Sequence, residues 1–474
     1  MSELLDLTIS QLHEGLRDKK FSSVEVTKTY LSEIEKKDPA VEAYLAVTKD
    51  RALEQAEAAD KIIATGKSFD PLCGVPCSIK DSITVKGMQA TTASKILENY
   101  IAPYDATVIT RLKNAGSVIL GKTNTDEFTM GISTENSAFK VTKNPHDITR
   151  VAGGSSGGPA AAVAAREAVF SLGSDTGGSI RLPASFCGIV GLNPTYGSVS
   201  RYGAIALASS LDQIGPLTKN VEDVKLVFKV ISGKDPKDAQ SHPYEFMESD
   251  HSLKGLRIGI PKEYFAHGID PEVEKIVRAA ILKAEKAGAE VVEVSLPHTE
   301  HGVAVYYIIV PAEASANLAR YDGIKYGLSV QEGSNLLDVY LKSRGRGFGK
   351  EPKRRILIGT YTLSAGYYDA YYKKAQEVRN LIKKDFVEAF KKVDVMFAPV
   401  SPMPAPKIGE KTNDPLSMYL MDIYTCPVKL AGVPALSIPA GTMDKLPVGL
   451  QIIGNYFEEN KILSVASQME KILQ

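Results

Sequence analysis

The chain has 474 residues, of which 44% are hydrophobic and 24% charged, an ordinary composition for a globular protein with a large core. Lysine plus arginine and aspartate plus glutamate both number 56, so the formal net charge is zero. Such a chain has no overall positive field with which to hold a polyanion such as RNA.

We expect a cytoplasmic protein without membrane contact. The first residues show no basic segment followed by an apolar run, so no secretory leader is expected, and the longest apolar stretch, around 303–312, is too short to cross a bilayer. Four cysteines are few for this length and have no paired metal-ligand spacing, which predicts buried free thiols. These are Cys73, Cys77, Cys187 and Cys426.

Helical and strand patterns alternate through the first part of the chain. The stretches 8–11 and 22–25 each fit a capping box, in which two side chains three residues apart satisfy backbone N–H groups at the start of a helix. A helical pattern also covers 51–64, whereas 74–81 and 117–120 are short β-type runs, the second apolar and bounded by glycines. This alternation predicts an α/β architecture.

The rest of the chain continues this pattern within one predicted domain, 1–474. A small-residue helix is predicted at 160–165, directly after Pro159, because proline is tolerated in the first turn of a helix. The polar stretch 233–252 predicts a surface linker or insertion. The other predicted elements are strands at 256–260, 290–294 and 393–397 and helices at 271–287 and 366–390.

Two clusters rich in glycine and serine, 153–158 and 173–179, are the strongest functional signal. Glycines at this density let the backbone adopt positive φ and come close to a ligand, with its N–H groups uncovered. Serine hydroxyls stand among these glycines. The pattern is typical of a site where a hydroxyl attacks a carbonyl carbon and backbone donors hold the resulting oxyanion.

Two other interpretations have less support. The segment 116–123 has the spacing of a phosphate-binding loop, but its middle positions are the apolar strand itself, whereas such a loop follows a strand. ATP binding to the isolated chain would test it. A Ser-His-Asp triad is disfavoured because most of the seven histidines lie in polar stretches and the Gly-x-Ser-x-Gly elbow is absent.

A lysine can replace histidine as the base that a serine nucleophile needs. A free lysine, with a pKa of about 10.4, is a poor base at neutral pH, and burial lowers that value. Lys80 ends an otherwise apolar strand, and its neighbour Asp81 should point to the opposite face, so the two are not expected to pair. Taken alone, the residues favour an exposed lysine at a strand end over a catalytic base.

Lys80 and the segments 153–158, 173–181, 185–188 and 194–197 together resemble the amidase signature family. The resemblance is specific, because several motifs coincide in order and spacing. It implies an α/β fold in which a central mixed β-sheet is flanked by helices on both faces. It also implies amide hydrolysis by two serines and a lysine.

Further blocks extend the resemblance nearly end to end and are similar to the glutaminase subunits of tRNA-dependent amidotransferases. Such an enzyme hydrolyses glutamine to glutamate and ammonia. In the complex, with ATP, the ammonia converts misacylated Glu-tRNA(Gln) or Asp-tRNA(Asn) to Gln-tRNA(Gln) or Asn-tRNA(Asn). The blocks are 209–215, 313–323, 353–356, 367–372 and 419–425.

The resemblance also implies catalytic roles. Ser179 is expected to be the nucleophile and Lys80 the base. Ser155, in a cis peptide with Gly154 or a neighbour, is expected to relay a proton between them, because a hydroxyl can donate and accept together. The oxyanion donors are expected to be the backbone N–H groups of Thr176, Gly177, Gly178 and Ser179.

Three more residues are implied to bind the substrate. Arg355 would pair with the α-carboxylate of glutamine and Asp422 with its α-amine, while Tyr306 lines the pocket. A planar guanidinium suits a carboxylate. Without the resemblance, Arg355 fits a solvated helix face and Asp422 a surface acid.

No cofactor or metal is implied in this chain, whereas ATP and Mg²⁺ would serve the complex. The implied partners are amidotransferase subunits B and C in a heterotrimer, with the misacylated tRNA held mainly by a partner. The alternatives are a free-standing amidase of another carboxamide and a catalytically weakened scaffold subunit. Ala152, Pro159 and Asn193 depart from the residues common in the family, and the first two lie beside the Ser155 loop.

Overall fold

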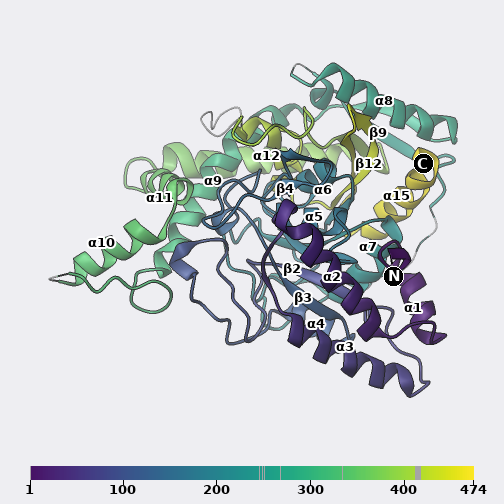
Figure 1. The fold of residues 1–474 in the computed structure, drawn as a ribbon. Coiled ribbons are helices and arrows are strands. Elements are labelled where there is room, and N and C mark those ends of the chain that lie inside the picture. Colours follow the sequence, from purple (N-terminus) through teal and green to yellow (C-terminus); the bar gives the residue numbers. More distant parts are fainter. Residues whose placement is uncertain are drawn as a thin grey trace.

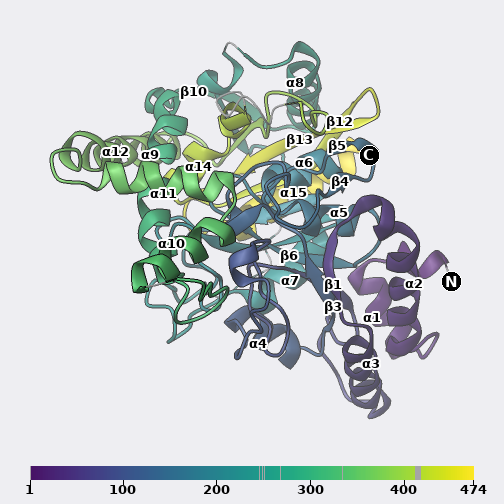
Figure 2. The ribbon, with the colours of Figure 1, turned by 60° about the vertical axis from the view of Figure 1, so that its left-hand side comes forward.

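The computed structural model describes residues 2–244, 246, 247, 249, 251–266, 268–333, 335–410 and 418–474. Its centre is an 11-stranded mixed sheet with the order β1-β3-β2-β6-β8-β7-β12-β13-β11-β9-β10. Helices pack on both faces of this sheet (Figures 1 and 2), which confirms the predicted α/β architecture. The strands are β1 (Tyr44–Val47), β2 (Pro76–Lys80), β3 (Val118–Thr123), β6 (Phe170–Asp175), β7 (Val190–Asn193), β8 (Gln213–Thr218), β9 (Arg257–Pro261), β10 (Glu290–Val294), β11 (Val395–Pro399), β12 (Ala435–Met443) and β13 (Leu446–Ile453), and a small separate sheet pairs β4 (Lys143–Asn144) with β5 (Asp147–Val151).

Most of the described helices connect neighbouring strands or cover the sheet. Short helical segments of other types lie next to some α-helices. Examples are the 3-10 helices η5 (Pro297–His301) and η8 (Leu420–Asp422) and the π-helix η7 (Asp369–Lys373). The α-helices are α1 (Ile9–Arg17), α2 (Ser23–Val41), α3 (Lys49–Ala64), α4 (Thr107–Asn114), α5 (Gly157–Ala164), α6 (Arg181–Cys187), α7 (Val221–Ile231), α8 (Pro271–Lys286), α9 (Gly302–Asn317), α10 (Leu336–Gly347), α11 (Lys350–Thr362), α12 (Lys374–Ala389), α14 (Cys426–Ala431) and α15 (Glu459–Leu473).

The local predictions hold for most elements. Both capping boxes form, with Thr8 and Ser22 as the N-caps of α1 and α2. The predicted helix 366–390 is wrong at its start, because η7 forms a π-helical turn there and α12 begins only at Lys374. All four cysteines are buried free thiols.

The phosphate-loop pattern 116–123 is largely strand β3. Its lysine, Lys122, is fully buried in an ion pair with Asp81, at 3.2 Å. The Lys122 ammonium also donates hydrogen bonds to the backbone carbonyls of Ile83 (2.8 Å) and Gln89 (3.0 Å). Lys122 is therefore a structural residue of the core rather than a phosphate ligand. Asp81 pairs with Lys122 and not with Lys80, as expected because the adjacent residues Lys80 and Asp81 point to opposite faces of the strand.

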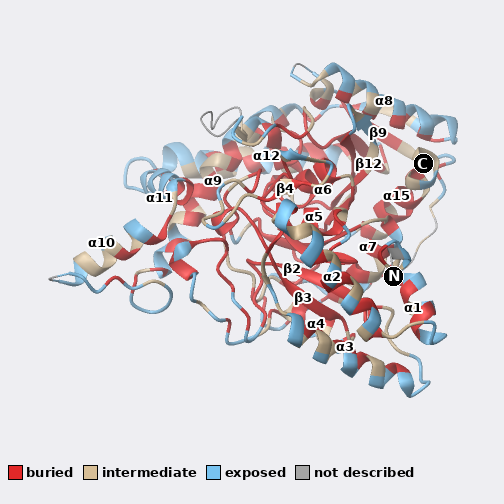
Figure 3. Cartoon of the chain, viewed as in Figure 1, coloured by how far each residue is buried: buried red, intermediate tan, exposed pale blue. Residues whose placement is uncertain are grey.

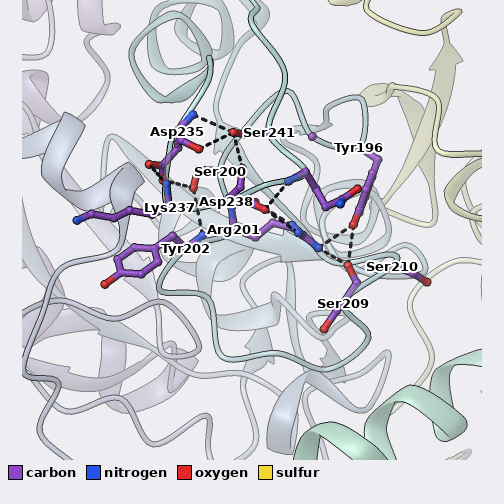
Figure 4. A network of polar contacts seen from close by, with 12 residues as sticks. Tyr196, Ser200, Arg201, Tyr202, Ser209, Ser210, Asp235, Lys237, Asp238 and Ser241 are labelled. Atoms are coloured by element: carbon purple, nitrogen blue, oxygen red, sulfur yellow. Dashed lines mark hydrogen bonds and ion pairs between the residues drawn. The ribbon is translucent and has the colours of Figure 1, made fainter.

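The polar stretch 233–252 is anchored to the domain over its first part. Asp235 accepts hydrogen bonds from Ser200 and Thr107, and Asp238 forms an ion pair with Arg201 at 2.8 Å. Figure 4 shows this network, in which both acidic side chains are nearly excluded from solvent. Buried carboxylates are retained only where donors satisfy them, so these contacts fix the segment against the body of the protein.

The apolar stretch around 303–312 lies within a longer helical run, 297–320, formed by η5, α9 and η6 (Leu318–Arg320). By length and composition alone this run could cross a membrane. The prediction that the apolar stretch here is too short to do so is therefore wrong for the whole helical run. More than half of its most apolar window is buried inside the protein. The run packs against α11, α12 and α14 around a second apolar cluster, as the core helix of a globular protein does.

Candidate active site

Lys80 stands at the end of β2, between the parallel strands β3 and β6. Its side chain is completely buried. The Nζ atom lies 2.8 Å from Ser155 Oγ, 2.8 Å from Ser156 Oγ and 3.3 Å from the carbonyl oxygen of Ser174. Burial disfavours the charged amine and lowers the pKa of Lys80 to about 7, against the pull of nearby carboxylates. At neutral pH a large fraction of this lysine is an uncharged base.

The first glycine-serine cluster forms the turn into α5. The Gly154–Ser155 peptide bond is cis. A Cβ atom on Gly154 would lie 2.3 Å from a carboxylate oxygen of Asp126 and 2.6 Å from the backbone nitrogen of Ser133, so only glycine fits. This close approach aims Ser155 at Lys80 Nζ.

Ser156 has no predicted role, yet it is fully engaged beside Ser155. Its hydroxyl donates to the carbonyl oxygen of Ser174 (3.0 Å) and accepts from the backbone N–H of Ser174 (3.3 Å) and from Lys80 Nζ. One donated and two accepted hydrogen bonds exhaust what a hydroxyl offers. Ser156 therefore fixes the position of the Lys80 amine, and its place in the same cluster was the signal available in the sequence.

The second cluster leaves the end of β6. A buried ion pair between Asp175 and Arg181, at 3.1 Å, closes the loop that contains Thr176, Gly177, Gly178 and Ser179. The Asp175 carboxylate also accepts from the backbone N–H of Ile180, at 3.1 Å. The carbonyl oxygen of Ser179 accepts from the backbone N–H of Ser156, at 3.1 Å, which joins the two clusters.

The loop glycines press against two predicted substrate residues. A Cβ atom on Gly177 would lie 2.6 Å from the ring of Tyr306, and one on Gly178 would lie 3.0 Å from a carboxylate oxygen of Asp422. The side chains of Tyr306 and Asp422 therefore lie directly against the backbone that carries the predicted oxyanion donors. Burial raises the pKa of Asp422 to about 7, and the nearby Asp175 adds to the rise.

Arg355 lies inside the protein on α11, rather than on a solvated helix face. Its Nε donates to a carboxylate oxygen of Glu351 at 2.8 Å, and its guanidinium lies 5.1 Å from the centre of the Tyr307 ring. Burial works against the charge, but the neighbours Tyr307 and Glu351 outweigh it and raise the pKa of Arg355. Glu351 stands four residues before Arg355, a helix spacing from which the pair could have been inferred.

A cavity of about 80 Å³ opens beside Arg355. Its walls include Ile132 and Ser133, the residues against which Gly154 packs. Ile132 and Ser133 thus separate this cavity from the Ser155 loop by one layer of residues, and Arg355 lies on the cavity's wall. In this way the fold brings together Lys80, Ser155, Ser179, the 176–178 loop, Tyr306 and Asp422 at one place, with Arg355 at its edge.

The departures from the family pattern lie close to this place. Ala152 is buried, and its carbonyl oxygen accepts from the Cys187 thiol. Pro159 lies in the first turn of α5, where it breaks no helical hydrogen bond. Asn193, at the end of β7, accepts a hydrogen bond at 2.8 Å from the buried amine of Lys429, so a lysine side chain from helix α14 reaches this position.

More than half of this sequence is shared with curated relatives over nearly its full length. The glutamyl-tRNA(Gln) amidotransferase A subunit of Caldanaerobacter subterraneus subsp. tengcongensis is 57% identical over 99% of this chain and 97% of its own length. The protein of the same name from Trichormus variabilis is 55% identical over 98% of this chain and 97% of its own.

Solved structures with the same fold include a protein of the same name as these relatives. The crystal structure of the glutamyl-tRNA(Gln) amidotransferase A subunit from Thermotoga maritima is 42% identical, covers 99% of this chain and 95% of its own, and has a TM-score of 0.82. A vestigial protein complex, described as revealing the evolutionary origins of an s-triazine catabolic enzyme, is 32% identical, with 98% of each chain covered and a TM-score of 0.87. The Amidase family model matches residues 25–463, and because it spans nearly the whole chain, this protein belongs to the amidase family.

Proposed function

We propose that this chain is the glutaminase subunit of a tRNA-dependent amidotransferase, with Lys80, Ser155 and Ser179 as its catalytic residues. The observation that carries the proposal is the 2.8 Å contact between the buried Lys80 amine and Ser155, beside a glycine loop that ends in Ser179. Relatives with more than half of their residues identical over nearly the full length bear the name of such an amidotransferase, which supports the proposal.

The contacts of Lys80 support a defined orientation of its uncharged form. A neutral amine has two N–H groups and one lone pair. The N–H groups point at acceptors, Ser156 Oγ and the carbonyl oxygen of Ser174, because the Ser156 hydroxyl already donates its own proton. The lone pair then faces Ser155, which is where a base must receive a proton.

The reaction follows from this orientation. Ser179 Oγ attacks the side-chain carbonyl carbon of glutamine, and its proton passes through Ser155 Oγ to Lys80 Nζ. Backbone N–H groups of residues 176–179 hold the oxyanion. The C–N bond breaks, ammonia leaves with the proton returned from Lys80, and glutamate stays bound as an ester of Ser179. Water then hydrolyses the ester by the same relay, which releases glutamate.

Two charged side chains support glutamine as the substrate. A free amino acid carries a carboxylate and an ammonium, and the site offers Arg355 and Asp422. An amidase for a simple carboxamide needs neither charge. Tyr306, packed on Gly177, would form the apolar wall along the substrate's methylene groups.

The partners of this proposed glutaminase are subunits B and C in a heterotrimer, in the cytoplasm. One partner would hold the misacylated tRNA and use ATP and Mg²⁺ to activate its carboxylate. The zero net charge of this chain supports that division of labour, because the protein that grips RNA needs positive charge.

The test is ammonia release from glutamine by the purified chain, with and without subunits B and C, beside a Ser179→Ala variant. We expect release that depends on Ser179 and rises with the partners. Turnover of other amides without any effect of the partners would support a free-standing amidase instead. Absence of release in every assembly would support a scaffold role.

The proposed roles also predict the pH dependence. Lys80 must be uncharged to accept a proton, and Asp422 must be ionised to bind an ammonium, and both pKa values are about 7. As the pH falls below 7 both groups gain the unwanted proton, so kcat/KM for glutamine should fall more steeply than about tenfold per pH unit. Asp422→Asn should leave only the Lys80 titration and restore a slope of about tenfold. A flat profile of kcat/KM between pH 6 and 8 would contradict both assignments.

A further inference from the structure

We propose that the outer face of α11 and the turn that follows it form the surface on which the ammonia-receiving partner docks. This α11 surface consists of Leu357, Ile358, Tyr361, Tyr367 and Tyr371, all of which are exposed. The inference rests on the proposed function, because it assigns a place to the partner that the function requires.

The α11 surface is more apolar than an outer helix face needs to be. Leu357 is 71% exposed and Tyr361 49% exposed. The rings of Tyr361 and Tyr367 lie 4.2 Å apart, and Tyr371 lies 6.1 Å from Tyr367, so the three aromatic rings form one cluster at the surface. Figure 3 shows this part of the molecule as exposed. Contiguous exposed apolar side chains on a soluble protein mark an interaction site.

The opposite face of the same helix reaches the active site. Gly359 lets α11 approach α9 closely, since a Cβ atom there would lie 1.8 Å from the carbonyl oxygen of Pro311. Arg355 and Glu351 extend this inner face into the cavity whose walls include Ile132 and Ser133, the residues against which Gly154 of the Ser155 loop packs. A partner bound to the outer face would therefore lie one helix away from the place where ammonia is released.

The surface also indicates what the partner presents. Between Ile356 and Tyr372 the only charged residue is Asp369, whereas exposed basic side chains, Lys350, Lys353 and Arg354, stand at the N-terminal end of α11. Aromatic side chains at the centre and arginine or lysine at the rim are typical of protein interfaces. We therefore expect a protein partner with an apolar centre and acidic residues opposite that end of the helix. The low charge at the centre disfavours RNA, which binds mainly through its phosphates.

The experiment uses the full chain, affinity-tagged and mixed with purified subunits B and C of the same organism. Leu357→Glu and Tyr361→Glu place a charge in the centre of the α11 surface. Leu282→Glu is the matched control, because Leu282 is 52% exposed on α8, away from α11. Affinity is measured by light scattering after size exclusion and by titration, and Ser179-dependent glutaminase activity of each isolated chain reports on its folding.

We expect each of the two variants to weaken assembly by about thirtyfold or more, as at the centre of an interface, with Leu282→Glu within about twofold of the unaltered chain. Their glutaminase activity without partners should stay unchanged. Unaltered assembly of both variants would overturn the proposal, as would a defect confined to tRNA binding or to self-association. Loss of glutaminase activity from every chain would instead contradict the proposed function, while the assembly measurement would still decide the docking surface.

Discussion

Lys80→Met is expected to lower kcat for glutamine hydrolysis by about four orders of magnitude, without loss of stability. The variant removes the only amine in contact with Ser155 among the described residues, so the proton of Ser179 has no base to reach. Methionine fills a similar volume without a charge. Burial lowers the pKa of Lys80 to about 7, and among the described residues Lys80 forms no ion pair, so its replacement leaves no carboxylate without a cation and the melting temperature should change little.

Lys122→Met provides the matched control on the neighbouring strand. Lys122 is equally buried, but it pairs with Asp81, and its removal leaves that carboxylate without its cation. We expect a loss of about 3–5 kcal/mol in the free energy of unfolding, with kcat nearly unchanged in the folded fraction. The two buried lysines should thus give opposite results. A Lys80→Met enzyme with normal kcat, or a loss of kcat explained by unfolding, would end the assignment of Lys80 as the base.

The double variant Lys80→Met with Ser179→Ala sharpens this test. Residues that act as one catalytic unit lose activity together, so the second change should cost almost nothing after the first. Single-turnover measurements on all three variants give the coupling. Losses that multiply would indicate that the lysine and the serine act separately.

Much of this structure follows from short sequence patterns, because their causes are local. A capping box satisfies the backbone N–H groups of its own helix, and the apolar run 117–120 predicts a buried strand whatever its neighbours, which the structure shows as β3. The glycine-serine clusters are recognisable for the same reason: only glycine permits the close approach that Gly154 makes to Asp126.

What the sequence did not reveal depends on contacts between distant segments. Arg355 fits a solvated helix face until Gly359 brings α11 against α9 and Tyr307 lies beside the guanidinium. The burial of Asp238 requires Arg201, which lies 37 residues earlier in the chain. A charged side chain is buried only where an oppositely charged or hydrogen-bonding residue pairs with it, and sequence periodicity does not show which distant residue that is.

The second large effect is expected at Arg355. Arg355→Met should lower kcat/KM for glutamine by about 10²- to 10³-fold, because removal of one member of a buried charge pair costs about 2–5 kcal/mol. For an amide of similar length that lacks the α-carboxylate, such as butyramide, kcat/KM should change by less than about threefold, since no carboxylate is there to bind. Lys353→Met, which removes an exposed cation from the same helix, is the control for net charge.

The comparison of the two substrates separates binding from folding. Arg355→Met also leaves Glu351 without the donor at 2.8 Å, and a variant that merely unfolds would lose both activities in the same proportion. Arg355→Lys keeps the charge but not the planar fork, so it should recover part of the glutamine activity and little of the lost selectivity. Equal losses on glutamine and butyramide in a folded Arg355→Met enzyme would show that this arginine supports the α11–α9 packing, and the carboxylate would then need another partner.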